Sequence, residues 1–315
     1  MPSIVSRLEI RQLRYFVAVV DAGSFSQAAG IAGVAQPALS QQIAQLEEIV
    51  GARLLLRSRT GIKPNAQGMA LYRHAEAILR MVADTDAVVL GGAGEVHGRV
   101  RLGLPSSIAV VLSGPLFAAV RARFPGIRLE LYESPSGYLA PQLANEHVEL
   151  SVLVEAAERD AVQQVPLVDE ALFFISNAPL PGVPAGKSIA LDRLTDIPLV
   201  LTTPATTLRQ IINSEFVRAS ITPVVHAEVS SVFTMLLLAS SGAGGGILPG
   251  SAISGHGSLH AYQIEPPIRR RAHLAYSRVT PLSIASESVR DVLLTTVAEL
   301  VTAGRWPGAT LLPQA

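Results

Sequence analysis

Between residues 36 and 50, apolar residues recur at helical spacing and fall on one side of a helix. The apolar stripe consists of Leu39, Ile43, Leu46 and Val50. At about 100° per residue, the opposite side consists of Pro37, Gln41, Ala44 and Gln45. Proline suits the first turn of a helix and Gly51 is a typical stop, so the pattern predicts an amphipathic helix over residues 36–50.

Two further helices are predicted before this one. The first has an apolar stripe of Ile10, Leu13, Phe16, Val17 and Val20. The second begins at Ser24, which together with Gln27 has the pattern of a capping box, and it ends near Gly33. A short turn then leads into the helix over residues 36–50. Two short helices joined by a tight turn are typical of a helix-turn-helix.

The segment after Gly51 predicts two short strands with a basic tip. Arg57, Arg59 and Lys63 would contact phosphates or the adjacent minor groove there. A helix-turn-helix followed by such a wing predicts a DNA-binding domain over residues 1–65. Residues 1–63 contain seven Lys/Arg and four Asp/Glu, whereas the remainder contains 18 and 21, so the positive charge is concentrated in this domain.

The polar residues of this domain divide into two expected roles. Amide and hydroxyl groups on an exposed helix can bond base edges in the major groove, and short neighbours let the helix lie close. The residues expected to choose the sequence are Gln36, Ser40, Gln41 and Gln45, and Ser24 and Pro37 are further expected DNA-binding residues. The residues expected at phosphates are Arg11, Arg14, Arg57, Arg59 and Lys63. Taken singly, each of these residues also suits an ordinary solvated surface.

Helical periodicity continues from residue 66 to about residue 91. The apolar positions follow the four-three spacing of a heptad seam, with Thr85 filling one gap. The seam consists of Leu71, Ala75, Ile78, Val82 and Val89. A lone helix would expose this stripe, so we expect it to pair with a second chain, although packing onto its own domain would also cover it. Clustered glycines then predict a hinge over residues 92–98.

From residue 99 onward, strand-like and helix-like segments alternate. Strands are predicted at residues 100–104, 127–132, 150–154, 172–176, 199–201, 224–229, 246–248 and 272–276. Helices are predicted at residues 109–124, 138–146, 207–219, 232–240 and 284–303. Such alternation is typical of an α/β fold with largely parallel sheets. We assign residues 99–305 to this domain and residues 306–315 to a tail.

Hydroxyl side chains recur where predicted strands end and helices begin. The positions are Ser106, Ser107, Ser136, Thr202, Thr203, Ser230 and Ser231. Ligands of parallel sheets bind beyond the carboxyl ends of strands, where hydroxyls and free backbone N–H groups can hold a small anion. Ordinary helix capping explains the same hydroxyls. No lysine or arginine flanks them and Arg209 is the nearest basic candidate, so a strongly charged ligand is not indicated, while a small acid is compatible.

The composition and motifs exclude several other classes. The chain has no cysteine, which excludes disulfides and Cys-based zinc sites and is compatible with a reducing cytoplasm. Its first residues show no signal-peptide pattern. The uncharged run over residues 229–255 is interrupted by Ser, Gly and Pro, so we expect a buried helix, a glycine-rich turn and a buried strand rather than a membrane span.

Catalytic and metal-binding motifs are also missing. Neither a His-Glu-x-x-His run nor a Gly-x-Ser-x-Gly elbow occurs, and Ile247 stands where a dinucleotide fingerprint needs its third glycine. His256 and His260 are four residues apart, but flanking glycines disfavour a helix there. We therefore expect no metal, no cofactor and no enzymatic activity.

Residues 11–68 resemble the winged head of LysR-type transcriptional regulators. The family's motifs occur in order as Ser24-Phe25-x-x-Ala28-Ala29, Gln36-Pro37-Ala38-Leu39-Ser40, Ile43-x-x-Leu46-Glu47 and a wing leading into a helix at Gly68. Within the family, the Gln41–Gln42 pair resembles the nitrogen-assimilation-control and cysteine-regulon regulators at these positions. Many members carry arginine where this chain has Gln41. Gly30 stands where better helix formers are usual, and it should weaken the second helix by ~1 kcal/mol relative to alanine.

The resemblance covers the rest of the chain more loosely and implies its architecture. It implies a dimerising linker helix over residues 66–91 and a two-lobed effector domain similar to periplasmic binding proteins. Lobe I would comprise about residues 99–168 and 269–305, and lobe II about residues 169–268. The hydroxyl-bearing loops would line the cleft between them.

We therefore expect a cytoplasmic, sequence-specific DNA-binding transcriptional regulator, controlled by a small-molecule effector between two lobes. It would form a dimer or tetramer, with RNA polymerase as a further candidate partner and without a membrane partner. An effector can shift the equilibrium between two geometries of the protein only if it binds them with unequal affinity. The alternative is a two-lobed small-molecule-binding protein or enzyme on the same fold.

Overall fold

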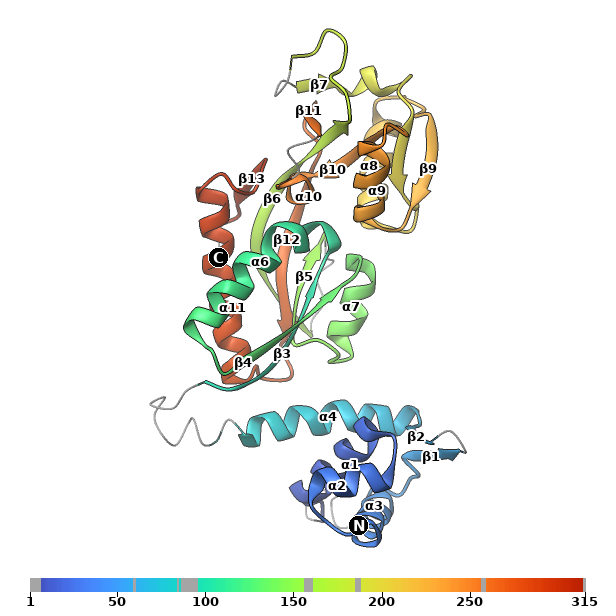
Figure 1. Ribbon diagram of the computed structural model, residues 1–315, viewed down its shortest axis with the longest axis vertical. Coiled ribbons are helices and arrows are strands. Elements are labelled where there is room, and N and C mark those ends of the chain that lie inside the picture. Colours follow the sequence, from blue (N-terminus) through green and yellow to red (C-terminus); the bar gives the residue numbers. More distant parts are fainter. Residues whose placement is uncertain are drawn as a thin grey trace. The chain divides into compact units, whose positions relative to one another are not determined.

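The computed structural model describes residues 7–58, 61–83, 85, 96–155, 161–184, 188–255 and 259–313, with only the backbone for Arg57 and Ala83. The chain divides into two compact units, Met1–Glu95 and Val96–Ala315. Figure 1 shows a small helical unit with a hairpin, and a larger unit of strands flanked by helices.

The first unit has the predicted winged helix-turn-helix fold (Figure 1). Its elements are α1 (Ile10–Ala22), α2 (Phe25–Ala32), α3 (Gln36–Val50), β1 (Leu55–Ser58), β2 (Gly61–Pro64) and α4 (Ala66–Ala83). The two strands pair antiparallel, from Leu55 opposite Pro64 to Ser58 opposite Gly61. The hairpin is therefore the predicted wing, and its tip, residues 59–60, lies outside the described residues.

The core of the first unit is formed by the apolar faces of α1, α2 and α3. Its most deeply buried members on α1 and α3 are Leu13, Phe16, Val19, Leu39, Ile43 and Leu46. The stripe predicted for α3 is confirmed, although Val50 is only half-buried. The prediction that Ile10 belongs to the core is wrong, because Ile10 is 46% exposed and Val19 fills the core position instead.

Glycines in the left-handed conformation end the first three helices. They are Gly23, Gly33 and Gly51, with φ between 62° and 73°. Ser24 precedes α2 as predicted, but its side chain makes no capping hydrogen bond, so the predicted capping box with Gln27 is wrong. A capping box occurs instead at the start of α1, where the backbone N–H of Glu9 donates to the side-chain oxygen of Gln12 at 3.1 Å.

Helix α4 begins at a capped and closely packed position. The backbone N–H of Gly68 donates to Asn65 Oδ1 at 2.8 Å, so Asn65 caps the start of α4. The Asn65 amide in turn donates to the carbonyl of Arg53 at 2.6 Å. A Cβ on Gly68 would overlap the carbonyl oxygen of Leu54, so only glycine lets α4 lie this close to the segment before the wing.

The first half of α4 packs onto its own unit. Leu71 contacts the core formed by α1 to α3, and Ala75 is buried. Ile78 and Val82, farther along the predicted seam, are half-buried. Thr85 is still helical, whereas the rest of the predicted seam around Val89 and most of the predicted hinge lie outside the described residues.

The second unit alternates strands and helices (Figure 1). Its strands are β3 (Gly98–Leu104), β4 (Ile127–Glu133), β5 (Leu150–Val154), β6 (Val162–Ser176), β7 (Ser188–Ala190), β8 (Leu199–Thr202), β9 (Val225–Val229), β10 (Gly245–Pro249), β11 (His260–Glu265), β12 (Arg269–Ser277) and β13 (Ala309–Leu311). Its helices are α6 (Ser106–Arg123), α7 (Ser136–Ala144), η2 (Leu191–Leu194), α8 (Thr207–Arg218), α9 (Val232–Ser240), α10 (Gly250–Ile253) and α11 (Ile284–Thr302).

Two parallel sets of strands are joined by two long antiparallel strands. The strand order is β4-β3-β5-β12-β6-β10-β8-β9. β3 pairs parallel with β4 and β5, and β8 pairs parallel with β9 and β10. β6 and β12 pair antiparallel with each other and with their other neighbours. The prediction of largely parallel sheets therefore holds within each set but not for the strands that join them.

The second unit contains two separate hydrophobic cores. One includes Val168 of β6 and Ala272 of β12, whereas the other includes Leu172 of β6 and Ile268 just before β12. Both long strands thus pass from one core to the other within four residues. The sequence predicted only residues 172–176 of β6, because residues 162–171 lack the apolar run of a typical buried strand.

The predicted tail is an integral part of the second unit. Trp306 is only 2% exposed, and β13 pairs with β6 from Ala309 opposite Glu170 to Leu311 opposite Val168. Residues 306–311 are therefore not a free tail. The strands β7, β11 and β13 were not predicted. β7 and β13 have only three residues each, and strands this short are defined by their pairing partners rather than by their own pattern.

The uncharged run forms the predicted order of a helix, α9, a turn over residues 241–244 and a buried strand, β10. The prediction that the helix is buried is only partly correct, because Phe233 and Leu237 on α9 are 69% and 53% exposed. Among the residues that the structure describes, none of the helices combines the length and hydropathy that crossing a bilayer requires.

Two glycine substitutions should change the stability of the first unit in opposite directions. A Cβ on Gly30 meets nothing within 4 Å, and alanine is favoured over glycine in a helix by about 1 kcal/mol. Gly30→Ala should therefore slow amide hydrogen exchange of α1 to α3 in the full chain by about fivefold. Gly68→Ala should speed it, because the new methyl group overlaps the Leu54 carbonyl. Similar exchange in both variants would contradict this account of α4 packing.

Candidate functional site

Helix α3 presents uncharged polar side chains on its exposed side. Gln36, Pro37, Gln41 and Gln45 are exposed, and Ser40 is half-buried. Ala38 and Ala44 between them are also exposed and add little bulk. No lysine or arginine occurs on α3, so this surface offers hydrogen-bonding groups without positive charge.

The amides on this surface are not equally free. Gln42 Nε2 donates to Gln45 Oε1 at 3.0 Å, which holds Gln45 and leaves its Nε2 as a donor. Among the described residues, no side-chain hydrogen bond engages Gln36 or Gln41. Gln41 can therefore offer both its donor and its acceptor to one adenine edge.

Hydrogen bonds fix the wing relative to the helices. Glu47 Oε1 accepts from the backbone N–H groups of Leu54 at 2.7 Å and Leu55 at 3.2 Å. The backbone N–H of Ile62 donates to the carbonyl of Gly23 at 2.8 Å. The end of α3 and the turn before α2 thus both hold the hairpin, so the wing and α3 keep one relative orientation.

Four of the five basic residues expected at phosphates lie on α1 and on the two strands of the wing. Arg14 on α1 and Lys63 on β2 are exposed, and Arg11 is exposed but forms an ion pair with Glu9 at 3.1 Å. Arg57 lies on β1, but its side chain, like the whole of Arg59, lies outside the described residues. Ser24 is half-buried at the start of α2.

The second unit contains a pocket that gathers most of the predicted hydroxyl residues. Its volume is about 460 Å³, including the space at its mouth. The lining consists of Pro105, Ser106, Ser107, Pro135, Ser136, Val154, Thr202, Thr206, Thr207, Leu208, Ser230, Val232 and Arg270. We call it the hydroxyl pocket. Two other hollows, of about 740 and 720 Å³, contain none of the predicted effector-binding residues.

Five of the seven predicted effector-binding residues line the hydroxyl pocket. They are Ser106, Ser107, Ser136, Thr202 and Ser230. Thr203 and Ser231 lie outside its lining. The Thr203 carbonyl accepts from Thr206, and the Ser231 hydroxyl caps α9 by accepting from the N–H of Thr234. Ordinary helix capping therefore accounts for the Ser231 hydroxyl.

Four helices begin at the hydroxyl pocket. Residues in or beside the first turns of α6, α7, α8 and α9 all contribute to its lining. The first N–H groups of a helix have no partner within it, and the helix dipole adds partial positive charge at that end. Such an arrangement attracts a small anion.

Arg270 is the buried basic residue of this pocket, and the sequence did not indicate it. The residue is 4% exposed and forms an ion pair with Glu170 at 2.6 Å. Arg209, the predicted candidate, lies outside the lining and donates to Glu228 and to the Thr202 carbonyl, each at 2.8 Å. No lysine or arginine flanks the hydroxyls in the sequence, but in the fold Arg270 lies beside them, and its Nη2 donates to Ser107 Oγ at 2.7 Å. Arg270 reaches them from β12, more than 35 residues away in sequence from the nearest hydroxyl, Ser230.

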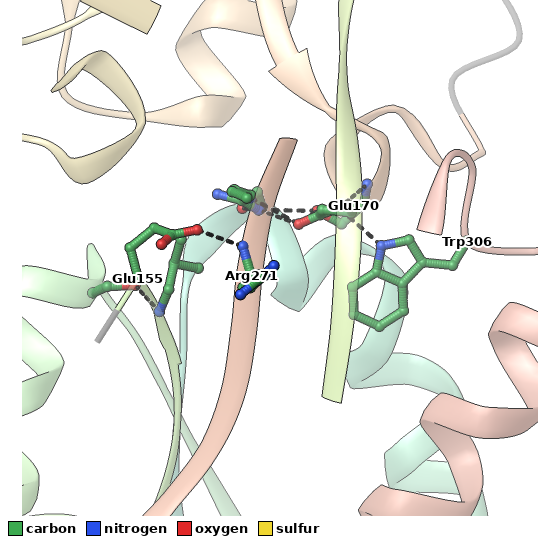
Figure 2. A network of polar contacts seen from close by, with 9 residues as sticks. Glu155, Glu170, Arg271 and Trp306 are labelled. Atoms are coloured by element: carbon green, nitrogen blue, oxygen red, sulfur yellow. Dashed lines mark hydrogen bonds and ion pairs between the residues drawn. The ribbon is translucent and has the colours of Figure 1, made fainter. Parts of the chain in front are cut away.

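Glu170 ties Arg270 to the C-terminal segment. The carboxylate is fully buried and accepts from Arg270, from the backbone N–H of Ser251 at 3.0 Å and from Trp306 Nε1 at 2.9 Å. Figure 2 shows the indole of Trp306 pointing at Glu170 across β6. On the other side of β12, the backbone N–H of Arg271 donates to Glu155 at 2.6 Å.

The described residues offer no metal site. Among them, no three His, Cys, Asp or Glu side chains lie close enough together to hold an ion. His273, three residues beyond Arg270, does not line the pocket. Burial is the largest influence on His273 and lowers its pKa, so the ring is neutral near pH 7.

Comparison with known proteins gives matches over both units. Residues 10–69 match the family model of the bacterial regulatory helix-turn-helix protein, lysR family. Residues 93–298 match the LysR substrate binding domain. The chain is 31% identical to the nitrogen assimilation regulatory protein nac of Escherichia coli over 299 residues, covering 93% of this chain and 97% of that protein. The corresponding protein of Klebsiella aerogenes is 30% identical, with 92% and 96% covered.

Solved structures share the fold over nearly the whole chain. A full-length OxyR variant from Pseudomonas aeruginosa has a TM-score of 0.75 at 21% identity, covering 98% of this chain and 99% of that one. Full-length CbnR in complex with its target DNA has a TM-score of 0.64 at 21% identity, covering 93% and 99%. The branch suggested by Gln41 and Gln42 agrees with the nac relatives. The chain belongs to the LysR family and is a DNA-binding transcriptional regulator with an effector-binding domain.

Proposed function

We propose that the hydroxyl pocket binds a small acid as the effector of this regulator. The observation that carries the proposal is the meeting of four helix N-termini, five predicted hydroxyl residues and Arg270 in one cavity. The alternative small-molecule-binding protein or enzyme lacks support, because the relatives are transcriptional regulators.

The lining of the hydroxyl pocket suits a carboxylate on a small body. Ser106 and Thr207 contribute hydroxyls that, among the described residues, have no hydrogen-bond partner. Leu208 and Val232 add apolar surface for the rest of the ligand. Because the lining comes from both cores, a ligand that contacts both would favour one arrangement of the lobes.

A thiol-based response can be excluded for this chain. Some relatives, 25–30% identical, are hydrogen peroxide-inducible genes activators. Peroxide sensing through sulfenic acid and disulfide chemistry requires cysteine, which this chain lacks. The signal of this regulator is therefore a bound ligand rather than cysteine oxidation.

On the DNA side, we propose that amides select the sequence and that basic residues supply affinity. Gln36, Gln41 and Gln45, with Ser40, would bond base edges from α3. Arg11, Arg14 and Lys63, together with Arg57 and Arg59, would contact phosphates. Different residues would then determine the sequence preference and the salt dependence of DNA binding.

We further propose that two chains pair through α4 and bind a two-fold DNA site. Met81 on α4 is 42% exposed, and Ile78 and Val82 remain half-buried in the single chain. A second copy of α4 would cover this apolar surface. Assembly into a tetramer and contact with RNA polymerase are further expectations for this bacterial regulator, which would act in the cytoplasm where its DNA lies.

Gln41→Ala and Arg14→Ala should affect DNA binding differently. Gln41→Ala should reduce the difference in binding free energy between operators that differ at one base pair, by about 1–3 kcal/mol. Arg14→Ala should weaken binding to all sequences alike. It should also reduce the slope of log affinity against log salt concentration by about 1, as expected for the loss of one phosphate contact. Titration of both variants on a set of operators at several salt concentrations measures both quantities. Arg218→Ala, in the second unit, is the control, and identical behaviour of the two head variants would refute the division of roles.

Thr207→Val should weaken effector binding, whereas Thr203→Val should not. Both substitutions replace a hydroxyl by a methyl group of similar size, but only Thr207 lines the hydroxyl pocket. A thermal-shift screen of small carboxylic acids identifies a ligand, and calorimetry then measures its affinity. We expect a loss of about three- to tenfold for Thr207→Val and no more than about twofold for Thr203→Val. Equal losses would place the ligand elsewhere.

A further inference from the structure

Arg270 occupies a distinctive place between the two cores. It lies on β12, the strand that leaves one core after Ile268 and enters the other at Ala272. Its side chain lines the hydroxyl pocket, yet the residue is 96% removed from solvent. A buried guanidinium carries five N–H donors, and each needs an acceptor.

The hydrogen bonds of Arg270 are unevenly distributed over its nitrogens. Nε donates to Glu170 Oε1 at 2.8 Å. Nη2 donates to Glu170 Oε1 at 2.6 Å and to Ser107 Oγ at 2.7 Å, and it lies 3.3 Å from Ser251 Oγ. Nη1 donates to no acceptor among the described residues, and it is not one of the fully enclosed polar atoms without a partner. Nη1 therefore keeps both of its donors free on a residue that lines the hydroxyl pocket, so a ligand there could accept from them.

The charge of Arg270 limits what the pocket can accept. Arg270 is the only charged residue in the lining among the described residues, and Glu170 behind it already neutralises it. A ligand with one negative charge gains the two Nη1 donors and the helix N-termini. A ligand with two negative charges would bring a second charge that no cation in the pocket balances.

Resting on the proposed function, we propose that Arg270 selects a monocarboxylate effector through Nη1 and that Glu170 transmits its binding to Trp306. A carboxylate on Nη1 shares the positive charge of the guanidinium with Glu170, which weakens the attraction between Arg270 and Glu170. Glu170 Oε2 is held at the same time by Ser251 and Trp306. The hydrogen bond from the indole therefore changes when the pocket is filled.

Trp306 connects this network to the C-terminal segment. Two residues later, the backbone carbonyl of Gly308 accepts from the backbone N–H of Ala171 of β6 at 3.0 Å. The next residues form β13, which pairs with β6. A change at Glu170 thus reaches β6, β13 and α10, which carries Ser251. The pocket and the C-terminal segment are in this way coupled through one carboxylate.

The single tryptophan of the chain makes the coupling measurable. Fluorescence of the full chain near pH 7 is titrated with acetate, propanoate and benzoate and with their uncharged amides. Calorimetry measures the same affinities independently. We expect at least one monocarboxylate to bind about tenfold or more tightly than its amide. Emission of Trp306 should change with the same midpoint as the heat of binding. Dicarboxylates of similar size should bind more weakly than the best monocarboxylate.

Two variants of Arg270 separate recognition from folding. Arg270→Lys keeps the charge opposite Glu170 but removes the Nη1 donors. The double variant Arg270→Gln with Glu170→Gln removes both charges, so neither is left buried alone. Both should lose about tenfold or more in affinity for the monocarboxylate. Arg101→Lys is the matched control, because Arg101 is also a buried arginine, paired with Glu149 at 2.8 Å, and does not line the pocket.

The outcomes distinguish this inference from the proposed function. If monocarboxylates bind and Thr207→Val weakens them, but both Arg270 variants bind normally, then the pocket is correct and the role of Arg270 is refuted. If binding depends on Arg270 but Trp306 emission stays constant at saturation, then the coupling is refuted. If dicarboxylates bind the unaltered protein but no monocarboxylate does, this inference fails and the proposed acid effector stands. If neither class binds at any soluble concentration, both fail.

Discussion

The second unit depends on pairing a carboxylate that has no access to water. An unpaired buried charge is strongly destabilising, so Glu170 requires donors on every side. Those donors come from parts of the chain far apart in sequence, namely Arg270 on β12, Ser251 at the start of α10 and Trp306 in the C-terminal segment. Satisfying Glu170 therefore fixes where β6, β12, α10 and the C-terminal segment meet. Arg270 stands between that carboxylate and the hydroxyl pocket.

The hydroxyl pocket follows from this arrangement and from the two parallel sets of strands. β3 and β8 each end beside a helix N-terminus, and the pocket lies where such ends from both cores converge. Neither core alone supplies the full lining. β6 and β12 pass between the cores, so the proposed ligand would bind where residues of both cores contribute to the lining.

The first unit satisfies a different constraint, which is to hold two DNA-facing elements in one orientation. Glu47 binds the start of the wing, and the carbonyl of Gly23 binds its second strand. Gly68 lets α4 pack closely behind them. Because α3 has no positive charge, it is chemically distinct from the elements that carry arginine and lysine. Under the proposed division of roles, affinity and sequence choice would be tuned separately.

The sequence by itself determined the elements whose signals are local. The period of Leu39, Ile43 and Leu46 determined α3 and its buried face, the wing followed from its basic hairpin, and strand–helix alternation determined the α/β class. Hydroxyls at strand ends were found because each adjoins a turn. Only the tertiary structure decided the partners of Arg270, the burial of Trp306 and the longer span of β6. These depend on contacts between residues about 100 or more positions apart, which no local period encodes.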